Sequence, residues 1–219
     1  MAVEQVPVTV TAGRVELEGD LSVPADPSGI VVFAHGSGSG RMSPRNRAVA
    51  QSLVSDGLAT LLFDLLTREE EIEERYTRHL RFDIPRLAER LAGTLAWVRE
   101  QERLASLPIG LFGASTGAAA ALIAAARVPG VGAVVSRGGR PDLARDALRD
   151  VRCPTLLIVG GADLDVLDLN RRAMRQMTAP TMIHVVPNAG HLFEEPGALR
   201  EVTEVASGWF RRHLARAAA

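Results

Sequence analysis

The stretch PIGLFGASTGAAAALIAAAR, residues 108–127, sets an apolar run directly before an alanine-rich run. Such a junction predicts a buried strand, a sharp turn and a helix, and the turn carries the pattern G-x-S-x-G. Gly113 and Gly117 lie two residues on either side of Ser115, where glycines let neighbouring backbones approach without Cβ clashes. We therefore expect Ser115 to stand on a strained turn as a nucleophile, and the alternative is a serine that only caps the helix.

Strands and helices alternate on both sides of this turn. Residues 6–24 alternate apolar and polar side chains around two turn-forming pairs, which predicts antiparallel strands. From residue 29 onward, short apolar runs alternate with amphipathic segments, which predicts an α/β fold with a mostly parallel sheet and helices on both faces. The expected buried strands are residues 29–35, 58–64, 108–114, 131–136, 154–160 and 181–186, and the expected helices include residues 43–57, 83–105 and about 196–215.

A charged run separates the strand that ends at Asp64 from the helix that begins near Asp83. Residues 68–78 are mostly charged, and we expect them to form a solvated helix. The alternative is that residues 66–82 act as a mobile lid over the site, because connecting segments often carry function.

Composition bounds the size and the partners of the protein. The chain has 219 residues, of which 47% are apolar, enough for one substantial core, so we expect a single domain over residues 1–219. A formal charge of −1 gives no basic surface for nucleic acid, and no uncharged apolar run reaches membrane-spanning length. The first residues lack a secretory signal pattern, and a sole cysteine excludes an internal disulfide. We expect a soluble cytoplasmic protein that acts on a small molecule, with no nucleic-acid or membrane partner.

A serine nucleophile needs a base, and lysine cannot supply it because all 25 basic residues are arginine. His191 meets the demand, since it follows the strand expected at residues 181–186, at the edge where open α/β sheets place their active sites. The other histidines are expected to be structural or surface residues: His35 at the end of a strand, His184 within a strand, His79 in the charged helix and His213 in the last helix.

The third member of a triad should be a carboxylate that follows the preceding strand. Asp163 does so directly after the strand expected at residues 154–160, which gives the chain order Ser, Asp, His. Asp165 and Asp168 are alternatives, but we expect them in the turn and the first turn of the next helix, where carboxylates stabilise a helix N-terminus.

An oxyanion hole needs two backbone donors beside the nucleophile. The Thr116 N–H is the first, because it directly follows Ser115. The second should come from the glycine-rich loop at residues 35–40, with Ser37 preferred and Gly36 next. Alternatives for this loop are a flexible turn or a phosphate cradle, but the chain lacks both G-x-G-x-x-G spacing there and any lysine, so a nucleotide site is not expected.

Arginines follow the strands at the same edge and are candidates for substrate binding. Arg137 is the first choice because it lies between a buried strand and two glycines, and Arg41 is the second. The alternative is that Arg41, Arg45 and Arg140 are solvated or pair with acids such as Asp64 and Asp142. Cys153 precedes its strand and belongs to the opposite edge, so a structural role is expected. No spacing indicates a metal, and no cofactor is expected.

These motifs resemble those of the dienelactone-hydrolase-like branch of the α/β-hydrolases: residues 113–117, Asp163, His191, the loop at residues 35–38 and the run at residues 81–85. The resemblance covers nearly the whole chain and implies a central sheet of about eight strands without a separate cap domain. The chain also resembles the hydrolase module that some bacterial proteins carry beside a phosphoribosyltransferase domain, although no second domain is expected here. Dienelactone hydrolases use a cysteine where this chain has Ser115, so lactone specificity does not transfer.

The residues and the resemblance together predict a serine hydrolase that works through an acyl-serine intermediate. The predicted substrates are small carboxylic esters, among which lactones and anionic esters are candidates. An acyltransferase or a thioesterase would use the same triad with a different acceptor or leaving group. A protein of another class, a ligand-binding module on the same fold, is the third possibility.

Overall fold

The computed structural model describes residues 3–215. Its strands are β1 Val3–Ala12, β2 Val15–Pro24, β3 Ile30–Ala34, β4 Ala59–Phe63, β5 Ile109–Ala114, β6 Val131–Arg137, β7 Thr155–Gly160 and β8 Thr181–Val186. Its helices are α1 Pro44–Ser55, α2 Arg68–Thr77, α3 Ile84–Glu100, α4 Thr116–Arg127, α5 Leu164–Met174 and α6 Ala198–His213, with the 3₁₀ segments η1 Leu80–Phe82 and η2 Pro141–Asp150. Every strand and helix range predicted above overlaps one of these elements.

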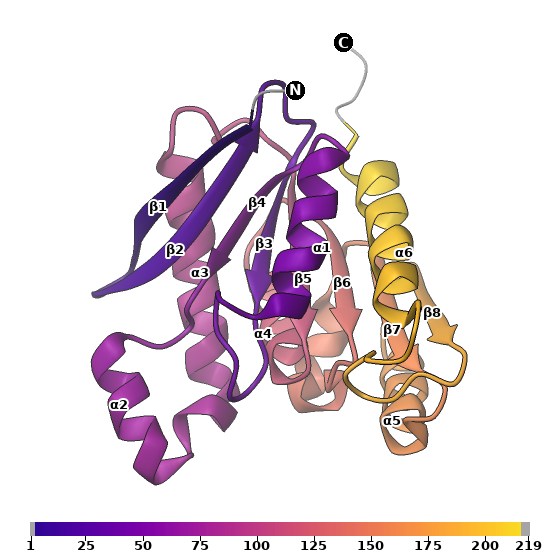
Figure 1. Ribbon diagram of the computed structural model, residues 1–219. Coiled ribbons are helices and arrows are strands. Elements are labelled where there is room, and N and C mark those ends of the chain that lie inside the picture. The colour runs from indigo at the N-terminus through magenta and orange to yellow at the C-terminus, as the bar shows by residue number, and fades with distance from the viewer. Residues whose placement is uncertain (1–2, 216–219) are drawn as a thin grey trace.

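The strands form one eight-stranded sheet in the order β1-β2-β4-β3-β5-β6-β7-β8 (Figure 1). From β4 to β8 all neighbours are parallel, whereas β1 pairs with β2 and β2 with β4 in the antiparallel sense. The carboxyl ends of the parallel strands therefore share one edge, toward the bottom of Figure 1. The predicted α/β-hydrolase fold is confirmed.

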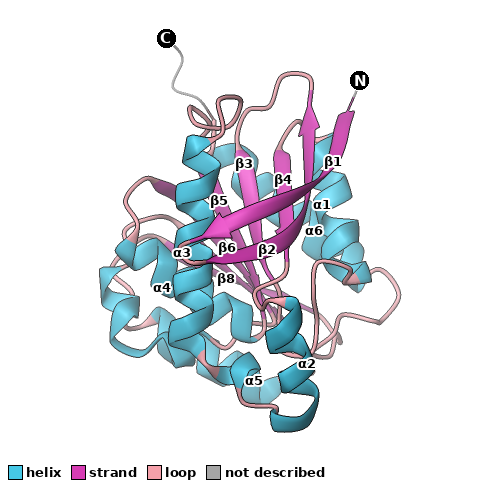
Figure 2. Cartoon of the chain, turned by 90° about the vertical axis from the view of Figure 1, so that its left-hand side faces the viewer, coloured by secondary structure: helices cyan, strands magenta, loops and turns pink. Residues whose placement is uncertain are grey.

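Two apolar cores lie on the two faces of the sheet. One packs the sheet against α3 and α4, and the other packs it against α1 and α6 (Figure 2). Strand β3 shows why its sequence is apolar throughout: Val32 and Ala34 belong to the first core, Val31 and Phe33 to the second. A strand buried on both faces has no polar alternation, because successive side chains enter opposite cores.

One helix boundary differs from the prediction. Helix α3 ends at Glu100, five residues before the expected Ala105. The backbone of Gln101 is extended, and the Leu104 N–H then donates to the Gln101 carbonyl in a turn. Leu104, which follows this turn, is buried in the core. Its apolar side chain fits the helical spacing of the sequence, which is why the predicted helix extends past the observed end.

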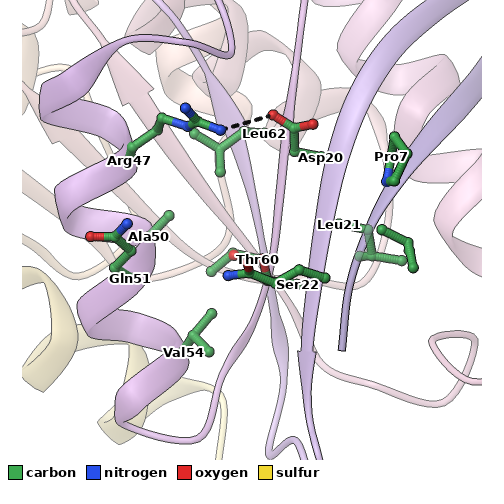
Figure 3. A pocket seen from close by; sticks show the side chains of 12 residues that line it. Pro7, Asp20, Leu21, Ser22, Arg47, Ala50, Gln51, Val54, Thr60 and Leu62 are labelled. Atoms are coloured by element: carbon green, nitrogen blue, oxygen red, sulfur yellow. Dashed lines mark ion pairs between the residues drawn. The ribbon is translucent and has the colours of Figure 1, made fainter. Parts of the chain in front are cut away.

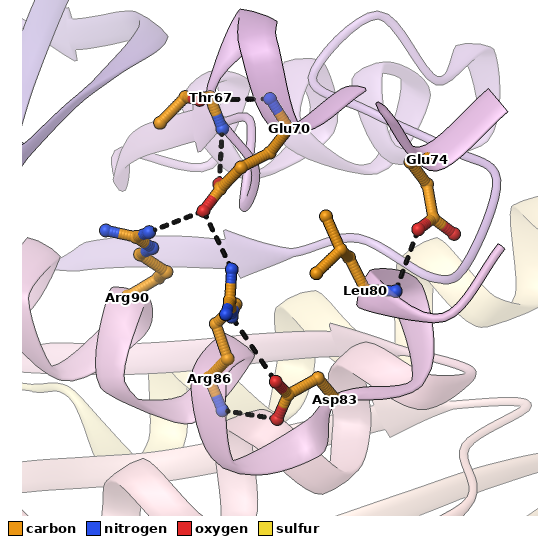
Figure 4. A network of polar contacts seen from close by, with 7 residues as sticks. All are labelled: Thr67, Glu70, Glu74, Leu80, Asp83, Arg86 and Arg90. Carbon is orange, nitrogen blue, oxygen red and sulfur yellow. Dashed lines mark hydrogen bonds and ion pairs between the residues drawn. The ribbon is translucent and has the colours of Figure 1, made fainter. Parts of the chain in front are cut away.

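The predicted charged helix is α2, and its first turn is fastened to the beginning of α3 (Figure 4). Thr67 and Glu70 form a reciprocal capping box. The Glu70 carboxylate also accepts hydrogen bonds from Arg86 at 3.0 Å and Arg90 at 2.8 Å. These contacts fix α2 against α3, which favours a stably packed helix rather than a mobile lid.

The far end of α2 departs from the expected solvated surface at Glu74, whose side chain is buried. Its carboxylate accepts a hydrogen bond from the Leu80 N–H at 2.8 Å and pairs with Arg81. The chain turns here because Arg78 adopts the left-handed conformation with φ of 54°. His79 therefore follows α2 rather than lying within it, although it is exposed as expected.

The helices of residues 3–215 include none that has both the length and the apolar character needed to cross a bilayer.

Candidate active site

Ser115 stands on the sharp turn between β5 and α4, as predicted. Its backbone has φ of 49° and ψ of −120°, a conformation that non-glycine residues rarely adopt and that clusters at functional sites. Hydrogen bonds fix it on both sides: its N–H donates to the Arg137 carbonyl at 3.2 Å, and its carbonyl accepts from the N–H groups of Ala118 and Arg140. The neighbouring strand thus holds the strained turn in position.

The two glycines of the motif are required by space. A Cβ atom on Gly113 would overlap the Ala118 backbone, and one on Gly117 would overlap the carbonyls of Ala34 and His35. Helix α4 consequently packs very close to β3 and β5, which explains why its buried side chains are mostly alanine.

His191 and Asp163 meet across two loops at the same sheet edge. The distance between His191 Nδ1 and Asp163 Oδ2 is 2.7 Å. An ionised carboxylate can only accept, so the imidazole proton is on Nδ1 and Nε2 is left as the basic nitrogen. Asp163 makes no side-chain capping bond to α5, which leaves its carboxylate available to the histidine. The two loops are also joined by the Ala162 N–H, which donates to the Ala189 carbonyl at 2.9 Å.

The competing acids have other surroundings. Asp168 forms an ion pair with Arg172 at 2.5 Å within α5, and Asp165 lies in the first turn of that helix. The structure thus pairs His191 with Asp163, the residue preferred from the sequence.

Gly138 lets the loop of His191 pack against the end of β6, the strand whose last carbonyl binds the Ser115 N–H. A Cβ atom on Gly138 would lie 3.0 Å from the His191 carbonyl oxygen and 3.6 Å from His191 Cε1. Gly138 directly follows Arg137, whose carbonyl binds the Ser115 N–H. For the described residues Ser115 and His191 the structure records no direct side-chain hydrogen bond, and such bonds often tighten only when a substrate is bound.

The predicted oxyanion residues surround the Ser115 turn, with one feature that the sequence did not indicate. The Thr116 N–H begins α4 and so has no acceptor within the helix. A Cβ atom on Gly36 would lie 3.0 Å from Ser115 Cβ, so the glycine loop touches the turn. The Ser37 N–H, however, donates to Thr116 Oγ1 at 3.0 Å. Ser37 can serve an oxyanion only if it shares this proton or the Thr116 hydroxyl rotates away.

His35 fixes the glycine loop, as its place at the end of β3 suggested. Its Nε2 accepts a hydrogen bond from the Leu65 N–H at 3.0 Å, and its Nδ1 lies 3.0 Å from the Gly36 carbonyl. These partners require a neutral ring with the proton on Nδ1. Burial lowers the pKa of His35, which favours the same neutral form.

Three of the four arginines at this edge are paired with acids. Arg41 pairs with Asp64 and, at 2.6 Å, with Glu18. Arg140 binds Asp142 through two nitrogens at 2.9 and 2.8 Å, and Arg45 lies 3.1 Å from Glu194. The structure therefore favours the alternative for Arg41, that of pairing with Asp64, and we remove Arg41 from the candidate substrate-binding residues.

Arg137 differs from the other three. The residue is only 9% exposed, and among residues 3–215 no carboxylate lies within ion-pair distance of it. Its Nη1 is buried without a hydrogen-bond partner. Burial and the like charge of Arg45 lower the pKa of Arg137 to about 10. The nearness of Arg45, which belongs to the first turn of α1, was not visible in the sequence.

Cys153 is buried before β7, at the edge opposite to Ser115, as predicted. Burial raises the pKa of its thiol from 9.0 to about 11. We expect native protein at pH 8 to react with a disulfide reagent about a hundredfold more slowly than unfolded protein, because the thiolate fraction falls tenfold for each pKa unit. The rate of thionitrobenzoate release with and without guanidinium measures this. A native rate close to the unfolded rate would show an accessible thiolate.

The sequence matches a known family over most of its length. The model of the "Dienelactone hydrolase family" matches residues 17–214. Two relatives from strains of Mycobacterium tuberculosis, each named as a candidate phosphoribosyl transferase, are 58% identical over 209 residues. The match covers 94% of this chain and 46% of each relative, so the chain spans about half the length of these proteins.

Solved structures share the fold. A dienelactone hydrolase from Anabaena variabilis is 54% identical and superimposes with a TM-score of 0.95 over 97% of this chain and 99% of that one. The protein Est1E from Butyrivibrio proteoclasticus is 15% identical, with a TM-score of 0.79 over 96% of this chain and 99% of that one. At this low identity Est1E shows a common fold alone.

Proposed function

Because the chain belongs to the dienelactone hydrolase family, we propose that it is a serine hydrolase that cleaves small carboxylic esters through an acyl-Ser115 intermediate. The observation that carries this proposal is the 2.7 Å contact between His191 and Asp163 at the sheet edge where Ser115 stands on its strained turn. A base held in one tautomer at the same sheet edge as a serine on such a turn supports a role in acyl transfer.

The proposed reaction has two steps. His191 Nε2 takes the proton of Ser115 Oγ as the oxygen attacks the ester carbonyl, and the resulting imidazolium is stabilised by Asp163. The Thr116 N–H stabilises the negative oxygen of the tetrahedral intermediate, which collapses and releases the alcohol with the proton from His191. A water molecule, activated by the same nitrogen, then hydrolyses the acyl-serine.

Hydrolysis of p-nitrophenyl butyrate, together with covalent labelling by a fluorophosphonate, tests the proposal. We expect release of p-nitrophenol and a single labelled peptide that contains Ser115. Labelling elsewhere, or no hydrolysis of any short-chain ester, would contradict it. The Mycobacterium relatives, named as candidate phosphoribosyl transferases, are about twice as long as this chain. Ester hydrolysis is proposed only for the half of those proteins that this chain matches.

We further propose that the preferred esters carry an anionic group bound by Arg137. A buried guanidinium without a counter-ion is costly, and a substrate anion would offset that cost. The proposal is supported by the position of the Arg137 backbone, since its carbonyl accepts the Ser115 N–H and the following Gly138 packs close to the backbone of His191. Guanidinium groups offer a planar fork of donors that suits carboxylates and phosphates.

Substitution of Arg137 by methionine should separate anionic from neutral substrates. We expect KM for mono-p-nitrophenyl succinate to rise by roughly tenfold to a hundredfold, because a charged hydrogen bond is worth about 1.5 to 3 kcal/mol. KM for the neutral p-nitrophenyl butyrate should stay nearly unchanged. Steady-state kinetics on both esters measure the difference.

Arg140→Ala is the matched control, because Arg140 lies at the same edge but its charge is already paired with Asp142. It should affect both esters little. Equal losses on the two esters in Arg137→Met, or no loss on either, would remove Arg137 from substrate recognition while leaving the proposed hydrolysis intact.

A further inference from the structure

The short loop between β6 and η2, residues 138–140, is bound to two parts of the fold that the candidate active site needs. The Gly138 N–H donates to the Ile158 carbonyl of β7 at 2.8 Å. The Arg140 N–H donates to the Ser115 carbonyl at 3.0 Å. The loop thus connects the turn of the proposed nucleophile to the neighbouring strand.

The carbonyl between these two N–H groups, that of Gly139, is bound by a side chain. Asn170 of helix α5 donates its amide Nδ2 to this carbonyl at 3.0 Å and to the Val166 carbonyl of its own helix at 2.8 Å. These two bonds use both protons of the amide. A Cβ atom on Gly139 would overlap Ser136 and Ala118. The loop is therefore packed tightly against β6 and α4 and tied to α5 by the Asn170 side chain.

Asn170 is an unusual residue for its position, because it is 0% exposed in the interior of a helix. Asparagine is a poor helix former, since its side chain competes for backbone hydrogen bonds, and a buried amide is costly unless it is bonded. Its Oδ1 has no hydrogen-bond partner among the described residues. What the side chain contributes is therefore its donors, and the bond to Gly139 is the one that leaves the helix.

The same helix carries the proposed acid. Asp163 is the N-cap of α5, and Asn170 follows it by about two turns, so both lie on one side of the helix. Asp163 meets His191, while Asn170 meets the loop that binds Ser115. For the described residues Ser115 and His191 no direct side-chain hydrogen bond is recorded, so their spacing depends on the backbone segments that carry them.

We propose that Asn170 is a positioning residue that fixes the Ser115 turn relative to the pair formed by His191 and Asp163. It acts through the Gly139 carbonyl and does not touch the substrate. This inference rests on the proposed ester hydrolysis. A displacement of about 1 Å between reacting groups can lower a rate roughly a hundredfold, so a bond that sets this spacing would control turnover without altering how the ester binds.

Asn170→Leu tests the proposal, because it removes both donors and keeps a branched side chain of similar shape. We expect kcat for the neutral p-nitrophenyl butyrate to fall by roughly tenfold to a hundredfold. KM should change by less than about twofold, since no group that contacts the ester is removed. Asn170→Ala, which cannot overpack the site, should show the same split between kcat and KM. Steady-state kinetics on folded protein, checked by a thermal melt, measure it.

Hydrogen exchange of the ¹⁵N-labelled chain gives a second measurement that needs no substrate. We expect the amides of Gly138 and Arg140 to exchange roughly tenfold faster in Asn170→Leu, because loss of the tie to α5 lets the loop open locally. The amide of Ile30, which is bonded to the Pro108 carbonyl at the opposite edge of the sheet, should exchange as in the wild type.

Two buried threonines provide matched controls. Thr155→Val removes a side-chain hydrogen bond of the same kind, from Oγ1 to the Cys153 carbonyl at 3.2 Å, at the edge opposite to Ser115. Thr60→Val removes a buried hydroxyl from β4, in the wall of a pocket between α1 and strands β1, β2 and β4 (Figure 3). Strand β3 separates β4 from β5. Both controls should keep the wild-type kcat and the wild-type exchange rates of the loop.

Three results would overturn the proposal: wild-type kcat in both Asn170 variants, a control variant that loses as much kcat as they do, or loop amides that exchange at the wild-type rate in Asn170→Leu. A rise in KM with kcat unchanged would likewise contradict a positioning role. If the wild-type chain hydrolyses no short-chain ester, the proposed function fails, whereas the exchange rates still decide whether Asn170 holds the loop.

Discussion

Replacement of Ser115 by alanine is expected to lower kcat/KM for p-nitrophenyl butyrate by roughly 10³-fold or more, because the whole of the proposed covalent route passes through one hydroxyl. The fold should be kept, since the turn is fixed by backbone hydrogen bonds to Arg137, Ala118 and Arg140 rather than by the hydroxyl. Steady-state kinetics together with a thermal melt measure both expectations.

His191→Ala and the double variant are the controls for a shared step. Loss of the base should cost about as much as loss of the nucleophile, and combining the two should add little, because either change already disables the same proton transfer. Turnover near the wild-type level in Ser115→Ala, or losses that add in the double variant, would refute the assignment of these two residues.

Asp163→Asn is expected to give the second large effect, a fall in kcat of about 10²- to 10⁴-fold. The asparagine amide can donate a hydrogen bond to Nδ1 of His191 and so stabilise the tautomer that carries its proton on Nε2. In that tautomer Nε2 cannot accept the proton of Ser115. It also removes the charge that stabilises the imidazolium. Initial rates at saturating ester concentration give the change in kcat.

Asp165→Asn and Asp168→Asn are matched controls on the same loop and helix. Asp168 forms its ion pair with Arg172 on α5, so these changes should alter kcat only slightly. A larger loss in either control than in Asp163→Asn would move the acid to that residue.

The features that were predictable from the sequence are those fixed by local pattern. The strand, turn and helix around Ser115 follow from an apolar run, glycine spacing and alanine content, and the places of Asp163 and His191 follow from the rule that parallel strands end at one edge. Neither depends on knowing which distant segments touch.

The features that were not predictable depend on distant contacts. The hydrogen bond from Ser37 to Thr116 and the nearness of Arg45 to Arg137 join segments that only the folded sheet brings together. Glu74 shows the same limit, because its charge predicted exposure while its contacts with Leu80 and Arg81 bury it.

The order of the strands has a consequence for how the protein is made. Within residues 3–215, strand β8 lies at an edge of the sheet and pairs only with β7, and His191 follows it in the chain. During synthesis Ser115, the proposed nucleophile, leaves the ribosome before His191, its proposed base, so the proposed site is incomplete until β8 and the loop after it have formed. Transient fraying of that same edge would displace the proposed base, His191, without melting the centre of the sheet, because local opening at an edge costs less than global unfolding.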